Sequence, residues 1–280
     1  MTTKTFHRVA LAACISLASM SLSCLSMQED EKPNIEEALE TQKSIIINFL
    51  NRGEPSKAFV ELRPAMQRFP GNADLLSLMG LTQLALRNPS NAIKYLREAN
   101  DIESNSTSVL NLSSAYIENS EYARAIKILK KHMKAGKAFK AYTYPERLFH
   151  NLGLAYSKLK REKPAIKYFK RALGENSSFY LSLLQLGHSY QRLKKYNQAR
   201  IQYRKSIKAC NQCYEAVNSL ARNYVVSGNQ TAAVSLLKNY SKNKKIPNEM
   251  RVQAKNELAK LAKPNGKRSR TAKNLSNKRK

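Results

Sequence analysis

Few residues in this chain of 280 could support chemistry, because it holds only four cysteines and four histidines. The most compact motif is Cys210-Asn211-Gln212-Cys213. Two thiolates are half of the ligand set of a structural zinc site, and His132, His150 and His188 are distant in sequence. A redox CxxC motif needs a thioredoxin-like βαβ setting, which the flanking pattern lacks. In an oxidising compartment the motif predicts a local disulfide, with two free thiols as the alternative and zinc or redox catalysis less favoured.

His150 and His188 are the candidates for a general base. Neither is accompanied in the sequence by a nucleophile motif or a pair of carboxylates, which proton-transfer chemistry would need. We therefore interpret both histidines as polar residues of a binding groove. We expect a protein that is not an enzyme and that has no metal and no cofactor.

Cys24 ends a segment with the features of an export signal. Residues 1–8 are basic, Val9 to Leu22 is an uncharged apolar run of about 14 residues, and acidic residues 29–31 follow. With a small residue directly before Cys24, the end of this segment resembles the bacterial lipoprotein signal, in which the cysteine is acylated and residues 1–23 are removed. Cys14 is the less favoured acylation site, because the apolar run before it is too short. Each acyl methylene contributes about 0.8 kcal/mol to membrane anchoring. An ordinary signal peptide with an incidental cysteine is the alternative.

The elements that would position these residues recur with a period near 34 from residue 39 onward. Residues 146–179 show the pattern best, with Phe149, Leu152-Gly153 and Tyr156, then Ala165, Phe169 and Ala172. The mid-helix alanines recur at 58, 92, 125, 165, 199 and 233, with gaps of 34, 33, 40, 34 and 34. This spacing is typical of the tetratricopeptide repeat (TPR), whose small residues let two helices approach closely. It predicts an all-α fold, a TPR superhelical solenoid of six helix–turn–helix repeats.

The predicted repeats cover residues 39–72, 73–105, 106–139, 146–179, 180–213 and 214–247. Residues 248–262 are predicted to form a capping helix, which the exposed end of a repeat stack requires. Residues 24–38 are interpreted as an acidic linker. The 40-residue gap between the alanines at 125 and 165 predicts that Lys131 to Lys140 extends the second helix of the third repeat. Pro145 is predicted to open the next helix, because a residue in the first turn of a helix does not need a backbone N–H.

The net charge of +29 depends for its meaning on the compartment. The tail from Lys263 to Lys280 holds eight basic residues and no acid, and we expect it to be disordered. Outside the inner membrane, the anions available to it are lipid headgroups, lipopolysaccharide phosphates and acidic proteins. The tail is thus a candidate membrane contact, with a purely solubilising role as the alternative, and we expect no nucleic-acid partner. If Val9 to Leu22 were not a signal, a cytosolic nucleic-acid binder would be the interpretation.

A more specific resemblance is carried by residues 144–154, Tyr-Pro-Glu-Arg-Leu-Phe-His-Asn-Leu-Gly-Leu. This run, and Phe49-Leu-Asn-Arg-Gly53, resemble the type IV pilus biogenesis lipoproteins, the PilF/PilW/Tgl family of secretin pilotins. The resemblance implies a monomeric lipoprotein in the cell envelope, anchored to the outer membrane and facing the periplasm. It also implies secretin subunits as the partner, whose multimer assembly the protein would promote. A generic periplasmic TPR scaffold for other complexes is the alternative.

The family binds ligands in a groove lined by the first helix of each repeat, and the lining residues can be carried over by repeat position. The N-terminal half of the groove is then apolar and the C-terminal half basic, which suits an amphipathic partner segment. The same aliphatic residues could instead belong to the core. The candidate lining residues are Ile47, Leu50, Leu81, Leu84, Leu110 and Ile117, followed by His150, Leu154, Lys158, His188, Arg192 and Arg222.

Overall fold

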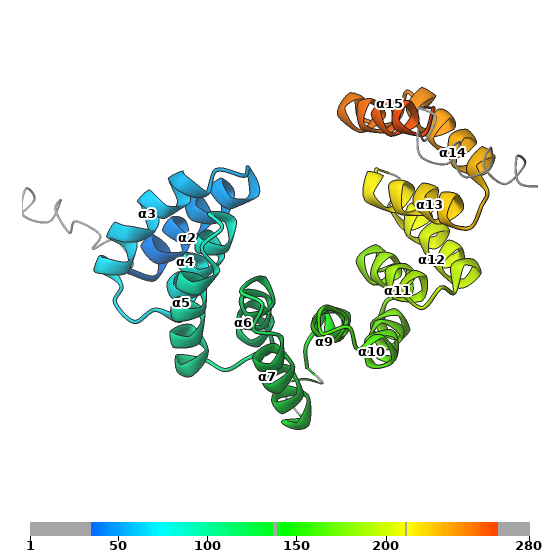
Figure 1. Cartoon of the computed structure of the whole chain (residues 1–280). Helices are drawn as coiled ribbons and strands as arrows, with labels where there is room; N and C mark the ends of the chain where they lie inside the picture. The colour runs from blue at the N-terminus through cyan, green and yellow to red at the C-terminus, as the bar shows by residue number, and fades with distance from the viewer. Residues whose placement is uncertain (1–34, 137–138, 140, 211, 263–280) are drawn as a thin grey trace, which may run out of the picture. The chain divides into compact units, whose positions relative to one another are not determined.

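The computed structural model describes residues 35–136, 139, 141–210 and 212–262 (Figure 1). Within these residues the chain forms thirteen helices and no strand. The expected all-α architecture of helical hairpins is therefore confirmed. Cys24 with its signal and the basic tail at 263–280 lie outside the described residues.

The helices divide between two compact units, residues 1–71 and 72–280. The described part of the first unit is one hairpin of α2 (Ile35–Asn51) and α3 (Pro55–Arg68), which buries Ile46, Ala58 and Leu62. Helix α2 begins four residues before the predicted first repeat, inside the segment that we interpreted as a linker. That interpretation was wrong for residues 35–38, since Glu36 and Glu37 in the first turn favour a helix start electrostatically.

The second unit is a series of hairpins followed by one further helix. Its helices are α4 (Ala73–Ala85), α5 (Pro89–Ile102), α6 (Ser106–Glu118), α7 (Tyr122–Lys134), α9 (Pro145–Lys158), α10 (Glu162–Glu175), α11 (Tyr180–Arg192), α12 (Tyr196–Ala209), α13 (Tyr214–Val226), α14 (Gln230–Lys242) and α15 (Asn248–Ala262).

Contacts between these helices define two faces of the second unit. The first helices α4, α6, α9, α11 and α13 contact one another in succession, and α13 also contacts α15. Each second helix (α5, α7, α10, α12 or α14) contacts its own first helix and the first helix that follows. We call the exposed sides of α4, α6, α9, α11 and α13 the first-helix face, and the exposed sides of α7, α10, α12 and α14 the second-helix face.

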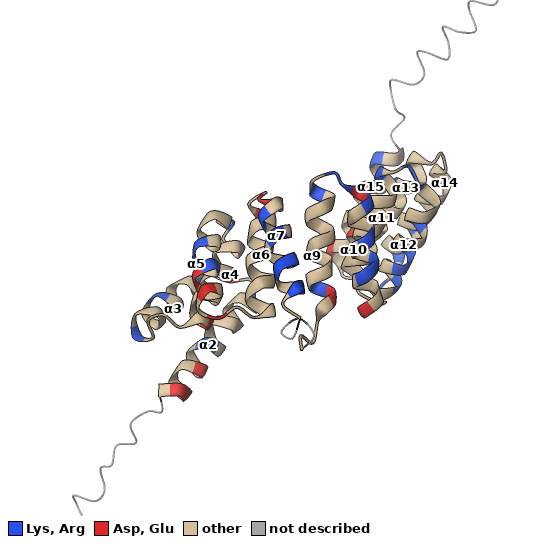
Figure 2. Cartoon of the chain, turned by 90° about the horizontal axis from the view of Figure 1, so that it is seen from below, with Lys and Arg blue, Asp and Glu red and all other residues tan. Residues whose placement is uncertain are grey.

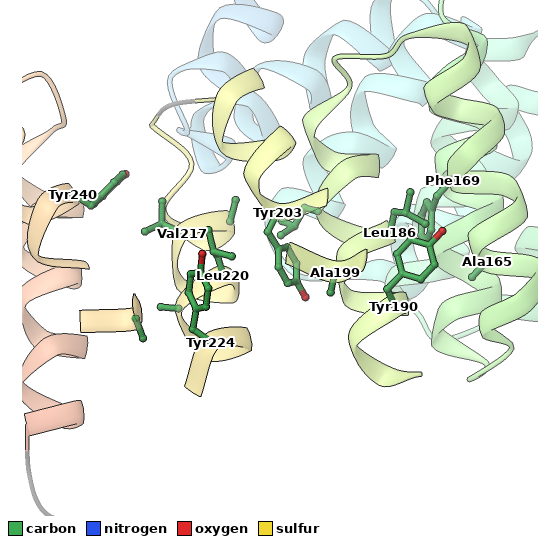
Figure 3. Close-up of a cluster of buried hydrophobic side chains, with 14 of the residues drawn as sticks. Ala165, Phe169, Leu186, Tyr190, Ala199, Tyr203, Val217, Leu220, Tyr224 and Tyr240 are labelled. Carbon is green, nitrogen blue, oxygen red and sulfur yellow. The ribbon is translucent and has the colours of Figure 1, made fainter. Parts of the chain in front are cut away.

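Small residues at the helix crossings allow this close packing. The six periodic alanines, from Ala58 to Ala233, are all fully buried, as their spacing predicts. At Gly153 a Cβ atom would lie 2.6 Å from the buried ring of Phe169, and at Gly187 it would lie 2.5 Å from Tyr203. Large residues fill the space between neighbouring hairpins (Figure 3). The aromatic rings of one helix thus occupy the space that glycine leaves on the other.

The turn inside each hairpin has one residue with a left-handed backbone. These residues are Gly53, Arg87, Ser120, Lys160, Lys194 and Gly228, with φ between 58° and 84°. The next backbone N–H closes the turn on the first helix, as when Arg161 donates to the carbonyl of Tyr156 at 2.9 Å. This is the hydrogen-bond pattern that commonly ends a helix before a sharp turn.

The connection from α7 to α9 differs in part from the prediction. Helix α7 ends at Lys134 and does not continue to Lys140, because Gly136 has a φ of +69°, which a right-handed helix cannot include. The prediction for Pro145 is confirmed, since it lies in the first turn of α9. The acidic Glu146 lies in the same turn.

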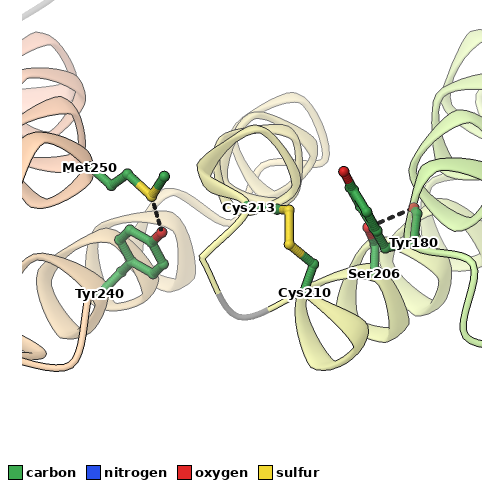
Figure 4. The surroundings of a disulfide bond; sticks show 6 residues. All are labelled: Tyr180, Ser206, Cys210, Cys213, Tyr240 and Met250. Carbon is green, nitrogen blue, oxygen red and sulfur yellow. Dashed lines mark hydrogen bonds between the residues drawn. A yellow bond between two sulfur atoms is a disulfide. The ribbon is translucent and has the colours of Figure 1, made fainter. Parts of the chain in front are cut away.

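The last hairpins are held by a disulfide and by α15. Cys210 ends α12 and Cys213 precedes α13, and the two form a disulfide with a Cα–Cα distance of 5.4 Å (Figure 4). On α15, Ala254 is fully buried, and Tyr214 Oη of α13 donates to the carbonyl of Gln253 at 3.0 Å. Among the helices of the described residues, none combines the length and the apolar character needed to cross a bilayer.

Candidate protein-binding face of the first helices

A cavity of about 410 Å³ opens on the first-helix face where the third, fourth and fifth repeats meet. Helix α6 contributes aliphatic, amide and hydroxyl groups, α9 contributes a cation and an amide, and the start of α11 contributes aromatic and aliphatic groups. Such a mixture suits a peptide segment with apolar side chains and free backbone polar groups. The lining residues are Leu110, Asn111, Ser114, Arg147, His150, Asn151, Phe179, Tyr180 and Leu181.

Asn151 fixes one wall of the cavity. Its amide nitrogen donates to Ser114 Oγ at 2.9 Å and to Ser113 Oγ at 3.0 Å, which ties α9 to α6. Arg147 stands at the exposed edge, with its guanidinium 5.0 Å from the centre of the Tyr144 ring. Both α9 side chains come from the Tyr144–Leu154 segment that carries the family resemblance. The most distinctive stretch of the sequence therefore forms part of the cavity.

His150 lies at the base of the cavity and links α9 to α11. Its Nδ1 shares a hydrogen bond of 2.9 Å with Ser182 Oγ, and its ring packs 5.3 Å from Phe179 and 5.7 Å from Phe169, centre to centre. Burial lowers the pKa of His150 from 6.5 to about 4. The ring is thus neutral at pH 7 and contributes shape and one hydrogen bond, but no charge.

His188 repeats this arrangement one hairpin later. Its Nε2 shares a hydrogen bond of 2.9 Å with Ser219 Oγ on α13. Burial, followed by the nearby charge of Arg192, lowers the pKa of His188 to about 4. Sequence reasoning placed no serine beside either histidine, because these contacts join residues 31 or 32 positions apart. Since Ser182 is fully buried and both rings are weak bases, the pairs are suited to joining first helices and not to nucleophilic attack.

The expected basic character of the C-terminal half needs correction. Both histidines are neutral at pH 7, and Arg192 Nε pairs with Glu162 Oε1 at 2.5 Å. Arg222 lies 3.6 Å from Glu257 of α15. Lys158 is exposed. Inter-repeat ion pairing, which depends on the fold, thus neutralises much of the positive charge that the sequence places here.

The aliphatic candidates lie at different depths. Ile117 is 6 % exposed and belongs to the core, so its predicted place on the surface of the groove was wrong. Leu81, Leu84, Leu110 and Leu154 are half-buried. Within the first unit, Ile47 is exposed on α2 and Leu50 is half-buried.

Sequence reasoning missed most of the residues that line the cavity. Asn111, Ser114, Arg147 and Asn151 lie on the same exposed sides of α6 and α9 as the residues that were chosen, so repeat position alone could have found them. Phe179 could not be found in this way, because it precedes α11 and reaches the cavity only through hairpin packing. Among the described residues, no group of three or more histidine, cysteine or acidic side chains could hold a metal ion.

Comparison with known proteins shows what this chain is similar to. The tetratricopeptide-repeat family model matches residues 146–179 and 180–213, the same two ranges that the spacing indicates. The type IV pilus assembly protein PilF of Pseudomonas aeruginosa is 26% identical over 200 residues, which cover 69% of this chain and 77% of that protein.

Solved structures agree in fold. A structure of Pseudomonas aeruginosa PilF has a TM-score of 0.62 at 22% identity, covering 80% of this chain and 99% of that chain. The crystal structure of PilW, a widely conserved type IV pilus biogenesis factor, has a TM-score of 0.66 at 15% identity, covering 77% of this chain and 98% of that chain.

A further sequence relative is the anaphase-promoting complex subunit CDC16 of Saccharomyces cerevisiae. It is 28% identical over 189 residues, which cover 67% of this chain but only 20% of that protein.

Proposed function

From the resemblance of this tetratricopeptide-repeat protein to PilF and PilW, we propose that it acts in type IV pilus biogenesis in the cell envelope by binding other proteins. One observation carries the proposal. The segment Tyr144–Leu154, which carries the family resemblance, supplies Arg147, His150 and Asn151 to the cavity on the first-helix face. A segment of a partner protein would bind there without chemical change.

The finer proposal concerns the partner and the anchor. Lipid on Cys24 would tether the protein to the inner leaflet of the outer membrane, and the cavity would take a segment of a secretin subunit. Leu110 and Leu181 would contact apolar side chains of that segment, and Asn111 and Arg147 would contact its backbone carbonyls or an acidic side chain. Binding in this way would hold subunits together at the membrane and promote their multimer assembly.

The partner is tested in a deletion strain complemented with variants of the cavity. Leu181, 37 % exposed at the start of α11, lines the cavity, whereas Leu193, 38 % exposed at the other end of α11, does not. We expect Leu181→Asp to lose secretin multimers from the outer membrane and Leu193→Asp to keep them. Normal multimers in the deletion strain would rule out the secretin role, and normal multimers with Leu181→Asp would rule out the cavity as the site.

The anchor is tested separately by labelling with radioactive palmitate and fractionating the envelope. Wild-type protein should carry the label and sediment with outer membrane. Cys24→Ala should carry none and should be absent from the outer-membrane fraction. Equal labelling of the two proteins would contradict acylation at Cys24 while leaving the protein-binding proposal in place.

A further inference from the structure

Charge is segregated between the two faces of the second unit. The second helices α7, α10, α12 and α14 hold fifteen basic residues and two acidic ones. The first helices of the same repeats, α6, α9, α11 and α13, hold four basic and three acidic residues. Figure 2 shows the basic residues along α7, α10 and α12. Nearly all of the excess positive charge of these eight helices therefore lies on the second helices.

The basic residues occupy the same positions in successive repeats. Counted from the buried alanine of each second helix, the fifth residue is Lys130, Lys170, Arg204 or Lys238. The sixth is Lys131, Arg171 or Lys205 in the first three of these helices. The cations thus recur at matching positions on successive second helices.

The four arginines of this face are engaged within the protein. Arg124 pairs with Glu121 at 2.5 Å. Arg171 lies 4.3 Å from the centre of the Phe149 ring. Arg200 lies over the ring of Tyr224 at 5.4 Å, and Arg204 donates to Tyr224 Oη at 2.6 Å. Arg124 and Arg171 are thus engaged within their own repeats, and Arg200 and Arg204 hold the fifth repeat against the sixth.

The lysines have no such commitment, apart from Lys130, which lies 5.5 Å from the centre of the Tyr156 ring. The other ten are exposed, and within the described residues none has a carboxylate at ion-pair distance. Glu162 is buried against Arg192, so Glu175 is the single exposed acid of these four helices. The ten lysines are Lys127, Lys131, Lys134, Lys163, Lys167, Lys170, Lys205, Lys208, Lys238 and Lys242.

We propose that the second-helix face binds an anionic lipid bilayer through these lysines. Lysine is a mobile point charge, which suits headgroups that diffuse and offer no fixed geometry, whereas arginine suits bidentate recognition of fixed phosphates and bases. Cations distributed over four helices match a surface of anions better than a single strand.

The aromatic side chains argue against single-stranded nucleic acid as the partner. Base stacking needs exposed ring faces. Here Tyr156 and Tyr168 stack on each other with centres 5.5 Å apart, and Arg161 and Lys130 lie over Tyr156. The ring of Tyr224 is covered by Arg200. The rings near the lysines are thus occupied within the protein.

The test measures vesicle binding by the mature chain, residues 25–280, produced without the signal segment, so that neither an acyl chain nor the apolar run Val9 to Leu22 contributes. A triple variant, Lys131→Glu with Lys170→Glu and Lys205→Glu, reverses one unengaged lysine on each of α7, α10 and α12. The control carries Arg87→Glu in the turn between α4 and α5, and Lys255→Glu and Lys260→Glu on α15, which are exposed residues outside the second helices. Both variants change the net charge by the same amount and keep the basic tail. Circular dichroism and the melting temperature establish that each is folded.

We expect binding to vesicles of phosphatidylglycerol and phosphatidylcholine in equal parts, and none to phosphatidylcholine alone. The triple variant should bind on the order of a hundredfold more weakly, from about fivefold for each lysine, and the control should bind like the parent. Raising the salt from about 0.1 M to about 1 M should abolish binding. Equal binding by the triple variant and the control would overturn the proposal. So would tighter, triple-variant-sensitive binding to single-stranded DNA, which would assign the face to nucleic acid.

Discussion

At the scale of single residues, buried histidine–serine pairs join parts of the stack. His150 and His188 each link one first helix to the next, and His132 Nε2 shares a hydrogen bond of 2.7 Å with Ser106 Oγ inside one hairpin. Burial lowers the pKa of all three rings. Each pair satisfies a buried polar group while the ring is neutral, and protonation would place a charge where no carboxylate compensates it.

We therefore expect acidification to lower the free energy of unfolding in a pH range above the one in which carboxylates titrate. The folded-state pKa of His150 and His188 is about 4, below the 6.5 of an exposed histidine. Between these values the unfolded chain binds more protons, so stability is full above pH 6.5 and is lost as pH falls toward 4. The free energy of unfolding should fall by up to about 1.4 kcal/mol per pH unit for each ring.

Urea titrations between pH 6.5 and 5 measure this slope. His150→Gln and His188→Gln keep a group that can bond to the serine but cannot titrate in this range, so each variant should flatten the slope. The slopes are compared and not the absolute stabilities, because repacking alters the latter. A slope that is unchanged in the double variant would contradict the assignment of this acid sensitivity to the two rings.

At the scale of elements, hairpin stability depends on the close crossing of its two helices. Gly153 is such a crossing, since an added Cβ would lie 2.6 Å from the ring of Phe169, which is fully buried. We expect Gly153→Ala to lower the free energy of unfolding by about 1–3 kcal/mol through overpacking. Gly174 in α10 has open space at its Cβ position, so Gly174→Ala should raise stability by up to about 1 kcal/mol.

Chemical denaturation of the two variants checks this prediction, because they make the same substitution in the two helices of one hairpin. The opposite signs are the decisive result. If Gly153→Ala were neutral or stabilising, the packing of Phe169 would have to be looser than the structure indicates.

The sequence predicted elements well and contacts poorly, for a physical reason. Helix positions follow from local spacing, so the periodic alanines and Pro145 were placed correctly. The burial of Ile117 and the neutrality of His150 depend on neighbours one hairpin away, which periodicity does not name. The pairing of Arg192 with Glu162 spans 30 residues and was missed for the same reason. The end of α7 was missed because Gly136 is a local stop inside a run that otherwise favours helix.

At the scale of the whole molecule, the net charge of +29 means that folding brings many like charges close together, and their mutual repulsion lowers the stability of the folded state. Ten exposed lysines without carboxylate partners lie on the helices of the second-helix face. Lysines three or four residues apart on one helix, such as Lys163, Lys167 and Lys170, have Cβ atoms about 5–6 Å apart, which is within the Debye length of about 10 Å at 0.1 M salt. We expect the melting temperature to rise when sodium chloride is raised from about 0.01 M to about 0.15 M.

Scanning calorimetry of the wild type and the Lys131→Glu, Lys170→Glu, Lys205→Glu variant checks the origin of this effect. Replacing three cations by anions should reduce the rise with salt, because attraction then offsets part of the repulsion. A melting temperature that falls with salt in the wild type would mean that ion pairs such as Arg192–Glu162 outweigh the repulsion.

The left-handed residue in each hairpin turn has a consequence for how such a chain can change in length. One residue more or less inside a hairpin would rotate one helix by about 100° against the other and break both faces. The six left-handed positions are spaced by 34, 33, 40, 34 and 34 residues, and the long interval falls at the joint between α7 and α9. Insertions are thus tolerated in the connections between successive hairpins, such as the one from α7 to α9, and not inside the hairpins. A protein of this kind evolves by gaining or losing whole hairpins, or by lengthening a joint.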